Sequence, residues 1–289
     1  MNVRPASPSD LEAITAFTTG TFEWGDYVAD RFLGWLDDAD SIVMVATDDT
    51  DTPIGLARAI HMSEREAWIH AARVAPAHRR TGVGSAVNEA LCDWARDRGA
   101  AIVRLLTEDW NTAAQRQVES SGYRRVCGWS WPMRELGTGR IDPITNGGKR
   151  VAGEEQLASG SRAEIDPAWV AWSSSDMASA GRSLIPLGWT FRRMTLEDVR
   201  EASRARELMQ CASGWVIARS RAEDSELFVP WVVTNPLDAP RLARAVVDLA
   251  ARRRMSTVMV MIPTIDWLED AFSRAGCEIR RGFIYARTL

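Results

Sequence analysis

Residues 73–84 read Arg-Val-Ala-Pro-Ala-His-Arg-Arg-Thr-Gly-Val-Gly, and this stretch decides the fold of the first half of the chain. An apolar run ends at Val74, a basic turn follows, and an amphipathic helix is expected from there on. Backbone N–H groups in such a turn point at whatever lies over the helix N-terminus, where the helix dipole favours an anion. Gly82 and Gly84 remove side chains that would block a pyrophosphate. The stretch therefore predicts a strand, a phosphate-binding loop and a helix.

Length and composition limit the classes of function. The 289 residues suffice for two domains, and a net charge of −4 provides no global basic field for nucleic acid or an anionic membrane. The four cysteines are far apart and form no Cys-x-x-Cys pair, which predicts free thiols in a reducing compartment. No signal peptide and no membrane-spanning apolar run is found. We therefore expect a cytoplasmic protein without a metal site and without nucleic-acid or membrane partners.

Hydrophobic periodicity divides the first 136 residues into alternating strands and helices. Strands are expected at 2–4, 42–47, 54–61, 67–74 and 102–106, and a final strand pair over 123–136. Helices are expected at 9–18, 25–37, 82–98 and 111–120, the third ending at Gly99.

The pattern Arg79-x-x-Gly82-x-Gly84, placed between such a strand and such a helix, resembles the acetyl-CoA signature of the GNAT superfamily of N-acetyltransferases. It is not the dinucleotide pattern Gly-x-Gly-x-x-Gly, because position 87 is Val87. The order of predicted elements is also the GNAT order, so the resemblance covers residues 1–136. It implies an acetyl-CoA-binding domain over 1–136 with acetyl-CoA as co-substrate.

The second half of the chain repeats the first. After a linker or excursion over 137–188, with a possible short helix, residues 189–289 show a similar order of elements. Asp198 stands where Asp10 stands in the first half, and 283–289 mirrors 130–136. The predicted fold class is therefore α/β (α+β): two tandem GNAT-like units, each a mixed, mostly antiparallel twisted sheet flanked by helices.

The second unit lacks the features that would hold acetyl-CoA. Where the first unit has its glycine loop, the second reads Leu237-Asp238-Ala239-Pro240-Arg241. Proline removes an N–H donor, and aspartate repels phosphate. A counterpart of the helix at 25–37 is also missing. We expect a degenerate GNAT-like domain over 189–289 that has a structural or substrate-shaping role and no cofactor of its own.

The resemblance assigns the residues that would hold acetyl-CoA in the first unit. An N–H at or beside Val74 would polarise the thioester carbonyl, because the strand before the loop diverges from its neighbour in GNAT proteins. The Arg79 and Arg80 guanidinium groups are available to phosphate. Asn111 matches a position that commonly contacts CoA, and it could equally be a plain helix N-cap. The predicted cofactor-binding residues are Val74, Arg79, Arg80, Thr81, Gly82, Val83, Gly84, Ser85 and Asn111.

Acetyl transfer to an amine needs a group that takes the proton of the ammonium, whose pKa is about 10.4. The candidates are His70 and Glu66. With a strand period of two, residues 66, 68, 70, 72 and 74 share one face. Both candidates have a plain alternative, since His70 can be a core or surface residue and Glu66 a solvated one.

The acceptor site is expected at the beginning of the helix at 25–37. Its acids could bind a cationic substrate, or they could simply favour the helix N-terminus. The predicted substrate-binding residues are Glu23, Asp26, Tyr27 and Trp68.

The tyrosine that many GNAT enzymes use as general acid for the leaving thiolate is missing here. The usual pattern, counted from Asn111, places Val118 at that position, and Tyr123 lies beyond Gly122 in a strand. We therefore do not move the role to Tyr123. Water could protonate the thiolate, since a thiol has a pKa near 8.5. Otherwise the acid comes from elsewhere or catalysis is weak.

The predicted function is acetyl-CoA-dependent N-acetyl transfer to the amine of a small molecule or amino acid, by direct attack on the thioester. Two alternatives stay open: a protein N-acetyltransferase, and a non-catalytic acyl-CoA-binding regulatory protein. The missing tyrosine and the degenerate second unit fit the non-catalytic protein. The intact glycine loop beside a strand with His70 and Glu66 fits an enzyme. A monomer or a homodimer is expected.

Overall fold

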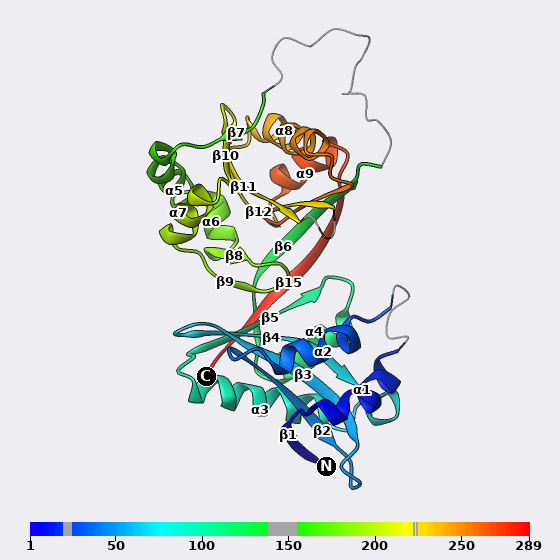
Figure 1. Cartoon of the computed structure of the whole chain (residues 1–289). Helices are drawn as coiled ribbons and strands as arrows, with labels where there is room; N and C mark the ends of the chain where they lie inside the picture. Colours follow the sequence, from blue (N-terminus) through cyan, green and yellow to red (C-terminus); the bar gives the residue numbers. More distant parts are fainter. Residues whose placement is uncertain (20–24, 138–154, 222, 224) are drawn as a thin grey trace. The chain divides into compact units, whose positions relative to one another are not determined.

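The computed structural model describes residues 1–19, 25–137, 155–221, 223 and 225–289, and its secondary structure is labelled in Figure 1. The chain forms two compact units. Unit 1 consists of Met1–Arg125 and Ile284–Leu289, and unit 2 consists of Val126–Phe283. Within the described ranges, no helix is long and apolar enough to cross a membrane.

Unit 1 is a twisted sheet with helices on both faces (Figure 1). Its strand order is β1-β2-β3-β4-β5-β15, and only β4 and β5 pair in parallel among the registers of β1 to β5. The strands are β1 (Asn2–Pro5), β2 (Ser41–Thr47), β3 (Pro53–Ser63), β4 (Glu66–Val74), β5 (Ile102–Glu108) and the end of β15 (Glu278–Thr288). The helices are α1 (Leu11–Thr18), α2 (Val28–Leu36), α3 (Val83–Asp97) and α4 (Thr112–Ser120), with short 3-10 turns at Pro8–Asp10 and Pro76–His78.

The apolar faces of α1 and α2 form one core of unit 1. Ile14, Val28 and Phe32 are fully buried against Val45 and Leu56 of the sheet. Helix α3 contacts β2, β3 and β4 on the opposite face of the sheet (Figure 1). The two faces therefore have different neighbours: α2 lies over one face of β4, and the N-terminus of α3 follows β4 on the other.

Unit 2 repeats this plan with additions. Its strand order is β6-β13-β12-β11-β10-β7, and β8 and β9 form a separate hairpin. The strands are β6 (Arg124–Glu135), β7 (Ala158–Ser159), β8 (Leu184–Pro186), β9 (Phe191–Arg193), β10 (Leu208–Cys211), β11 (Gly214–Arg221), β12 (Glu226–Val233), β13 (Thr257–Val260) and β14 (Ile262–Pro263). The helices are α5 (Ile165–Ser173), α6 (Asp176–Ala180), α7 (Leu196–Arg204), α8 (Ala239–Arg252) and α9 (Asp266–Arg274), with a 3-10 turn at Arg162–Glu164.

The internal repeat is visible at the level of single hydrogen bonds. Asp10 accepts hydrogen bonds from the Arg4 guanidinium at 2.9 Å and from the backbone N–H three residues before it at 2.7 Å. At the corresponding positions, Asp198 accepts bonds from Arg192 at 2.5 and 3.0 Å and from the backbone N–H three residues before it at 2.7 Å. Both aspartates belong to a capping box at the start of the first helical segment of their repeat. The predicted match between Asp10 and Asp198 is thus a structural equivalence.

Each repeat contributes its last strand to the other unit. Arg287, from the end of the chain, donates to the carbonyl of Ser121 at 3.2 Å, where α4 of unit 1 ends. Arg134, from the first repeat, donates to the carbonyl of Ala275 at 2.6 Å, where α9 of unit 2 ends. The predicted strand pair over 123–136 is therefore wrong. That segment is the single strand β6, and residues 284–289 provide the additional strand of unit 1.

The unit boundaries also differ from the predicted domains 1–136, 137–188 and 189–289. Unit 1 ends at Arg125 because β6 pairs with β13 and β14 of unit 2. Of the predicted linker, residues 138–154 lie outside the described residues, and the rest contributes β7, α5, α6 and β8 to unit 2. The possible short helix of the linker is the pair α5 and α6.

The missing counterpart of α2 is confirmed, since α7 is followed directly by β10 in the described chain. Helix α5, which precedes the repeat, packs against α7 and β12 instead. The α7 face of unit 2 is therefore covered by a segment that unit 1 does not have.

Candidate active site

A β-bulge shapes β4 in the middle of unit 1. Leu56 of β3 pairs with Arg73, and Arg58 pairs with His70, so two residues of β4 lie opposite one of β3. Ala71, within the bulge, has a φ of 59°, in the left-handed region. The bulge places Arg73 on the same face as His70, because their partners on β3 share a face.

This bulge corrects the predicted face of β4. Residues 66, 68 and 70 share one face as expected, but residues 72 and 74 do not continue it. Val74 pairs with Gly55 and lies on the α3 side, where its side chain would be 3.7 Å from a Cβ added at Gly84. The period of two fails because the extra residue shifts the alternation by one position.

Strands β4 and β5 separate just before the bulge. Their parallel pairing runs from Glu66 with Ile102 to Trp68 with Arg104 and then stops, although both strands continue. His70 to Val74 therefore have no backbone pairing with β5 in this part of the described chain. The divergence that the family resemblance implied is present, and it exposes backbone groups that an extended ligand could pair with.

The loop after β4 leads into an open helix N-terminus. Arg80 and Gly82 both have left-handed φ values, 65° and 91°. The Thr81 hydroxyl donates to the carbonyl of His78 at 2.6 Å, and Arg79 donates to that of Val74 at 3.3 Å. No side chain caps α3 in the described structure. Its first N–H groups and the helix dipole are therefore available to an anion.

Glycines let α3 lie close to the sheet and to α4. A Cβ at Gly55 would lie 2.5 Å from Val83, and one at Gly84 would lie 2.3 Å from the Nε2 atom of Gln117. The sequence singled out Gly84 but not Gly55 or Gln117. No local pattern could reveal those two, because each matters through a neighbour distant in sequence.

Asn111 is the N-cap of α4. Its Oδ1 accepts the backbone N–H of Ala114 at 3.1 Å, the geometry of an N-cap. Of its two predicted roles, the structural one is therefore observed.

His70 lies in a buried, cationic and aromatic environment below α2. Its ring meets that of Trp35 edge to face, with centroids 5.5 Å apart. Its Nε2 atom is buried and has no hydrogen-bond partner. Burial, together with the positive charges of Arg58 and Arg73, lowers the pKa of His70 to about 4. His70 is therefore neutral at pH 7, with a ring nitrogen left for a ligand.

Asp26 is held in an ion pair with Arg73. Its carboxylate accepts from Arg73 at 2.7 and 3.3 Å and from the backbone N–H of Val28 at 3.0 Å. The Asp26 side chain is 2% exposed. Tyr27, 39% exposed, lies next to the Arg73 guanidinium, 5.7 Å from ring centroid to Cζ. The negative charge of Asp26 is thus balanced by Arg73. Among the predicted substrate-binding residues that the structure describes, Tyr27 is the accessible one. Glu23 lies outside the described residues.

Glu66 and Trp68 lie at the closed end of the separation. Glu66 is ion-paired with Arg104 and accepts a hydrogen bond from Ser63 at 3.0 Å. Trp68 is only 1% exposed, so its side chain belongs to the core. Neither residue has the accessibility of Tyr27.

Two tyrosine hydroxyls of unit 1, those of Tyr123 and Tyr285, do not replace the missing general acid at Val118. Tyr123 is buried, donates to Asn88 at 2.9 Å, and has a pKa raised by burial. Tyr285 donates to Glu119 at 3.2 Å. Both hydroxyls are engaged with unit 1 itself.

The corresponding positions of unit 2 are closed. A bulge in β12 pairs Ile217 with Trp231 and Arg219 with Phe228. This is the register of the bulge in β4, with Trp231 at the position of Arg73 and Phe228 at the position of His70. Two buried aromatic residues thus replace an arginine and a histidine. Trp172 of α5 packs against Trp231, with ring centroids 6.3 Å apart.

The loop before α8 is closed as well. The Asn235 side chain accepts the N–H groups of Leu237 and Asp238 at 3.0 and 3.1 Å, and Asp238 pairs with Arg241. Ala239, which begins α8, has a side chain where α3 begins with a residue next to Gly84, and it is 1% exposed. Side chains therefore occupy the space that glycines leave open in unit 1.

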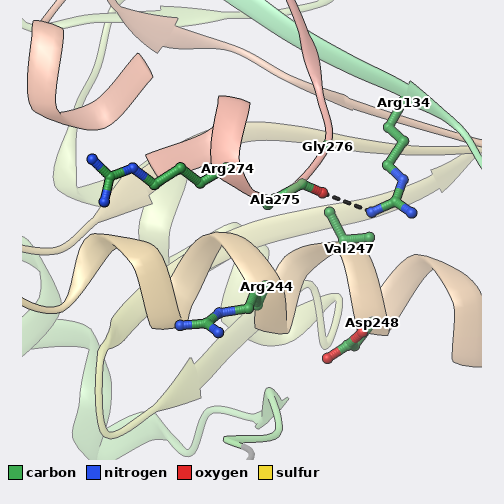
Figure 2. A pocket seen from close by; sticks show the side chains of 7 residues that line it. All are labelled: Arg134, Arg244, Val247, Asp248, Arg274, Ala275 and Gly276. Carbon is green, nitrogen blue, oxygen red and sulfur yellow. Dashed lines mark hydrogen bonds between the residues drawn. The ribbon is translucent and has the colours of Figure 1, made fainter. Parts of the chain in front are cut away.

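A small hollow of about 180 Å³ lies elsewhere in unit 2, between α8 and the end of α9 (Figure 2). Figure 2 shows the Arg134 guanidinium directed at the carbonyl of Ala275, to which it donates. The hollow lies at the C-terminus of α9, where backbone carbonyls rather than N–H groups face outward. It is therefore not a counterpart of the loop in unit 1.

Comparisons with known proteins agree with this geometry. Residues 11–123 match the model of the Acetyltransferase (GNAT) family, and no curated protein matches the sequence. A GCN5-related N-acetyltransferase from Sphaerobacter thermophilus has a TM-score of 0.68 at 14% identity, covering 99% of this chain and 95% of that chain. A putative acetyltransferase from Thermoplasma acidophilum has a TM-score of 0.60 at 14% identity, covering 100% of both. A tandem GNAT protein from the clavulanic acid biosynthesis pathway has a TM-score of 0.59 at 13% identity, covering 99% and 98%.

The chain therefore carries a GNAT acetyltransferase domain in its first half, and its fold as a whole is that of tandem GNAT proteins. The family implies acetyl transfer from acetyl-CoA. The predicted recognition and fold class are confirmed.

Proposed function

We propose that the protein is an acetyl-CoA-dependent N-acetyltransferase that transfers the acetyl group to the amine of a small molecule or amino acid. One observation carries the proposal: β4 separates from β5 beyond Trp68, directly before the uncapped N-terminus of α3. Acyl transfer from a long, phosphate-bearing thioester needs both features, an open strand edge for the arm and an anion site for the phosphates.

The residues present fit acetyl-CoA. The N–H groups of the loop and of the first turn of α3, over residues 79–85, would hold the pyrophosphate, with Arg79 and Arg80 as counter-charges. The backbone of β4 up to Val74 would pair with the pantetheine arm and orient the thioester. Bound there, acetyl-CoA supplies an activated acetyl group.

On the opposite face, His70 is the residue suited to receive the acceptor amine. It lies two residues beyond the last β4–β5 pair, and its buried Nε2 is without a partner. Because its pKa is about 4, it serves as a hydrogen-bond acceptor for a neutral amine, and water carries the proton away. Glu66 suits this role less, because its carboxylate is engaged by Arg104.

Tyr27 forms the accessible wall of the acceptor site, whereas Asp26 holds Arg73 and the start of α2 in place. With Val118 at the usual position of the acid and Tyr123 buried, water protonates the leaving thiolate. Unit 2, in which Asn235 occupies N–H groups of the loop before α8, binds no acetyl-CoA.

The experiment that tests the proposal compares two glycines with similar strain. Gly82 and Gly99 have φ values of 91° and 87° at opposite ends of α3. Gly82→Asp puts a charged side chain at the phosphate position, and Gly99→Asp imposes a similar backbone cost far from it. Calorimetry should show acetyl-CoA binding to the unchanged protein and to Gly99→Asp, and none to Gly82→Asp. Equal binding by all three proteins would refute the site.

An acceptor screen completes the test. Release of free CoA thiol is measured with amino acids, small amines, peptides and matched alcohols. Release with amino acids or small amines supports the proposal, and release with peptides alone supports protein N-acetylation. Tight acetyl-CoA binding without any release would favour a non-catalytic acyl-CoA-binding protein, which the absence of a tyrosine at Val118 also fits.

A further inference from the structure

Trp110 is a solvent-exposed residue of a loop whose backbone is held by hydrogen bonds. It lies between β5 and α4 and is 64% exposed, which leaves a large aromatic surface in water. The loop is held from several sides: the N–H of Asn111 donates to the carbonyl of Glu108 at 3.1 Å, and the Gln115 amide donates to the carbonyls of Glu108 and Asp109 at 3.0 and 2.9 Å. Its backbone is thus fixed while its indole ring is left uncovered.

The strand register places Trp110 at the open end of the separation between β4 and β5. The last pair joins Trp68 and Arg104. Val74, the last residue of β4, and Trp110, two residues past the end of β5, each lie six residues beyond that pair. His70 lies only two residues beyond it. Trp110 is therefore level with the start of the phosphate loop and not with the acceptor site.

The charges on the two sides of this opening differ. Arg79 and Arg80 follow β4, whereas Glu108 and Asp109 precede Trp110 on the β5 side. Phosphate groups are favoured on the β4 side and disfavoured on the β5 side. The β5 side suits the uncharged base of acetyl-CoA, with the 3′-phosphate of its ribose directed to the arginines on the β4 side.

We propose that the indole of Trp110 stacks on the adenine ring of acetyl-CoA. This inference rests on the proposed function, because it needs acetyl-CoA in unit 1 with its phosphates on residues 79–85. Adenine is the aromatic, uncharged part of the co-substrate, and it follows the pyrophosphate at the open end. A rigid aromatic side chain offers a stacking surface at little cost in conformational entropy.

The test removes either the indole or the base. Calorimetry measures the affinity of Trp110→Ala for acetyl-CoA and for S-acetyl-4′-phosphopantetheine, which lacks the adenosine. Base–aromatic stacking predicts that Trp110→Ala weakens acetyl-CoA binding roughly 5- to 100-fold. The same change should leave the affinity for S-acetyl-4′-phosphopantetheine within about twofold. Trp110→Phe should retain most of the affinity. Trp189→Ala, at a tryptophan of unit 2 that is 49% exposed, is the matched control and should change neither.

The outcomes separate this proposal from the one on which it rests. Equal weakening of both ligands, or of neither, by Trp110→Ala would overturn the stacking assignment while leaving the acetyl-CoA site intact. Failure of the unchanged protein to bind acetyl-CoA would overturn the proposed function and this inference together. A loss confined to acetyl-CoA, with Gly82→Asp abolishing both ligands, supports both.

Discussion

Replacement of Asp26 by alanine tests whether this residue is a structural anchor or a binding group for a cationic acceptor. The Asp26 carboxylate accepts both Arg73 donors and the Val28 N–H at the start of α2, so one side chain ties α2 to β4 over His70. If that contact is structural, its loss should appear first in the free energy of unfolding. If Asp26 binds the acceptor, its loss should appear in KM alone.

The magnitude follows from burial. The Asp26 and Arg73 side chains are 2% and 13% exposed, and removing one partner of a buried pair costs about 3–5 kcal/mol. The lost hydrogen bond from the Val28 N–H is part of this and is worth about 1 kcal/mol. Asp26→Ala should therefore destabilise the protein by about 4 kcal/mol, or on the order of 10 °C in Tm. The control is Asp93→Ala, which breaks an ion pair whose side chains are 48% and 66% exposed and should cost less than about 1 kcal/mol.

Urea unfolding followed by tryptophan fluorescence measures both variants, together with Arg73→Met and the double variant. The double variant should be less unstable than the sum of the single ones, because each single change leaves one charge without its partner. A cost for Asp26→Ala as small as that for Asp93→Ala would refute the anchor. The anchor would also be refuted if Asp26→Asn left the stability unchanged and raised only the KM for the acceptor.

Three further predictions follow from buried polar groups. Burial lowers the pKa of His70 to about 4, whereas the unfolded residue takes up its proton below about pH 6.5. The unfolded state therefore binds more protons in this window, and the unchanged protein should lose stability relative to His70→Gln as the pH falls from 6.5 to 4, by on the order of 3 kcal/mol. Urea midpoints at pH 7.5 and 4.5 measure this, and parallel curves would contradict it. Tyr123→Phe removes the hydrogen bond to Asn88 and should cost about 1 kcal/mol with no change in the rate of thiol release; a slower release would restore Tyr123 as an acid. Asp10→Ala and Asp198→Ala should each cost about 2 kcal/mol in urea unfolding, because the two sites make equivalent bonds, and strongly unequal costs would argue against the repeat.

Elements encoded by local periodicity could be predicted from the sequence. The helix expected at 82–98 is α3 (Val83–Asp97), and the strand expected at 102–106 is β5 (Ile102–Glu108). In both, the apolar spacing lies within one segment, and α3 is followed at once by Gly99, so no distant contact is needed to define them. The loop that we propose to hold acetyl-CoA could be singled out for the same reason, because its arginines and glycines are adjacent in sequence.

The acceptor side could not be predicted in the same way. The bulge in β4 depends on Ala71 in the left-handed region, and alanine has no intrinsic preference for that conformation. The ion pair of Asp26 with Arg73 joins residues 47 positions apart, so the carboxylate looked available when only its neighbours in sequence were considered. The exchange of the last strands is non-local as well, since it depends on which sheet edge each strand meets.

The exchange of the last strands between the two repeats gives a physical reason for keeping a second unit that, as we propose, has no acetyl-CoA site. Residues 284–289 belong to the second repeat, yet they complete the sheet of unit 1 beside β5, the strand whose divergence from β4 forms the proposed crevice. Through these residues Tyr285 binds Glu119 and Arg287 closes the end of α4 at Ser121. A sheet edge without its neighbour leaves backbone groups unpaired, which is costly for a buried strand. Unit 1 is therefore incomplete without the second repeat, and aromatic and aliphatic side chains could fill the equivalent positions of unit 2 without removing its role in holding β5 in place.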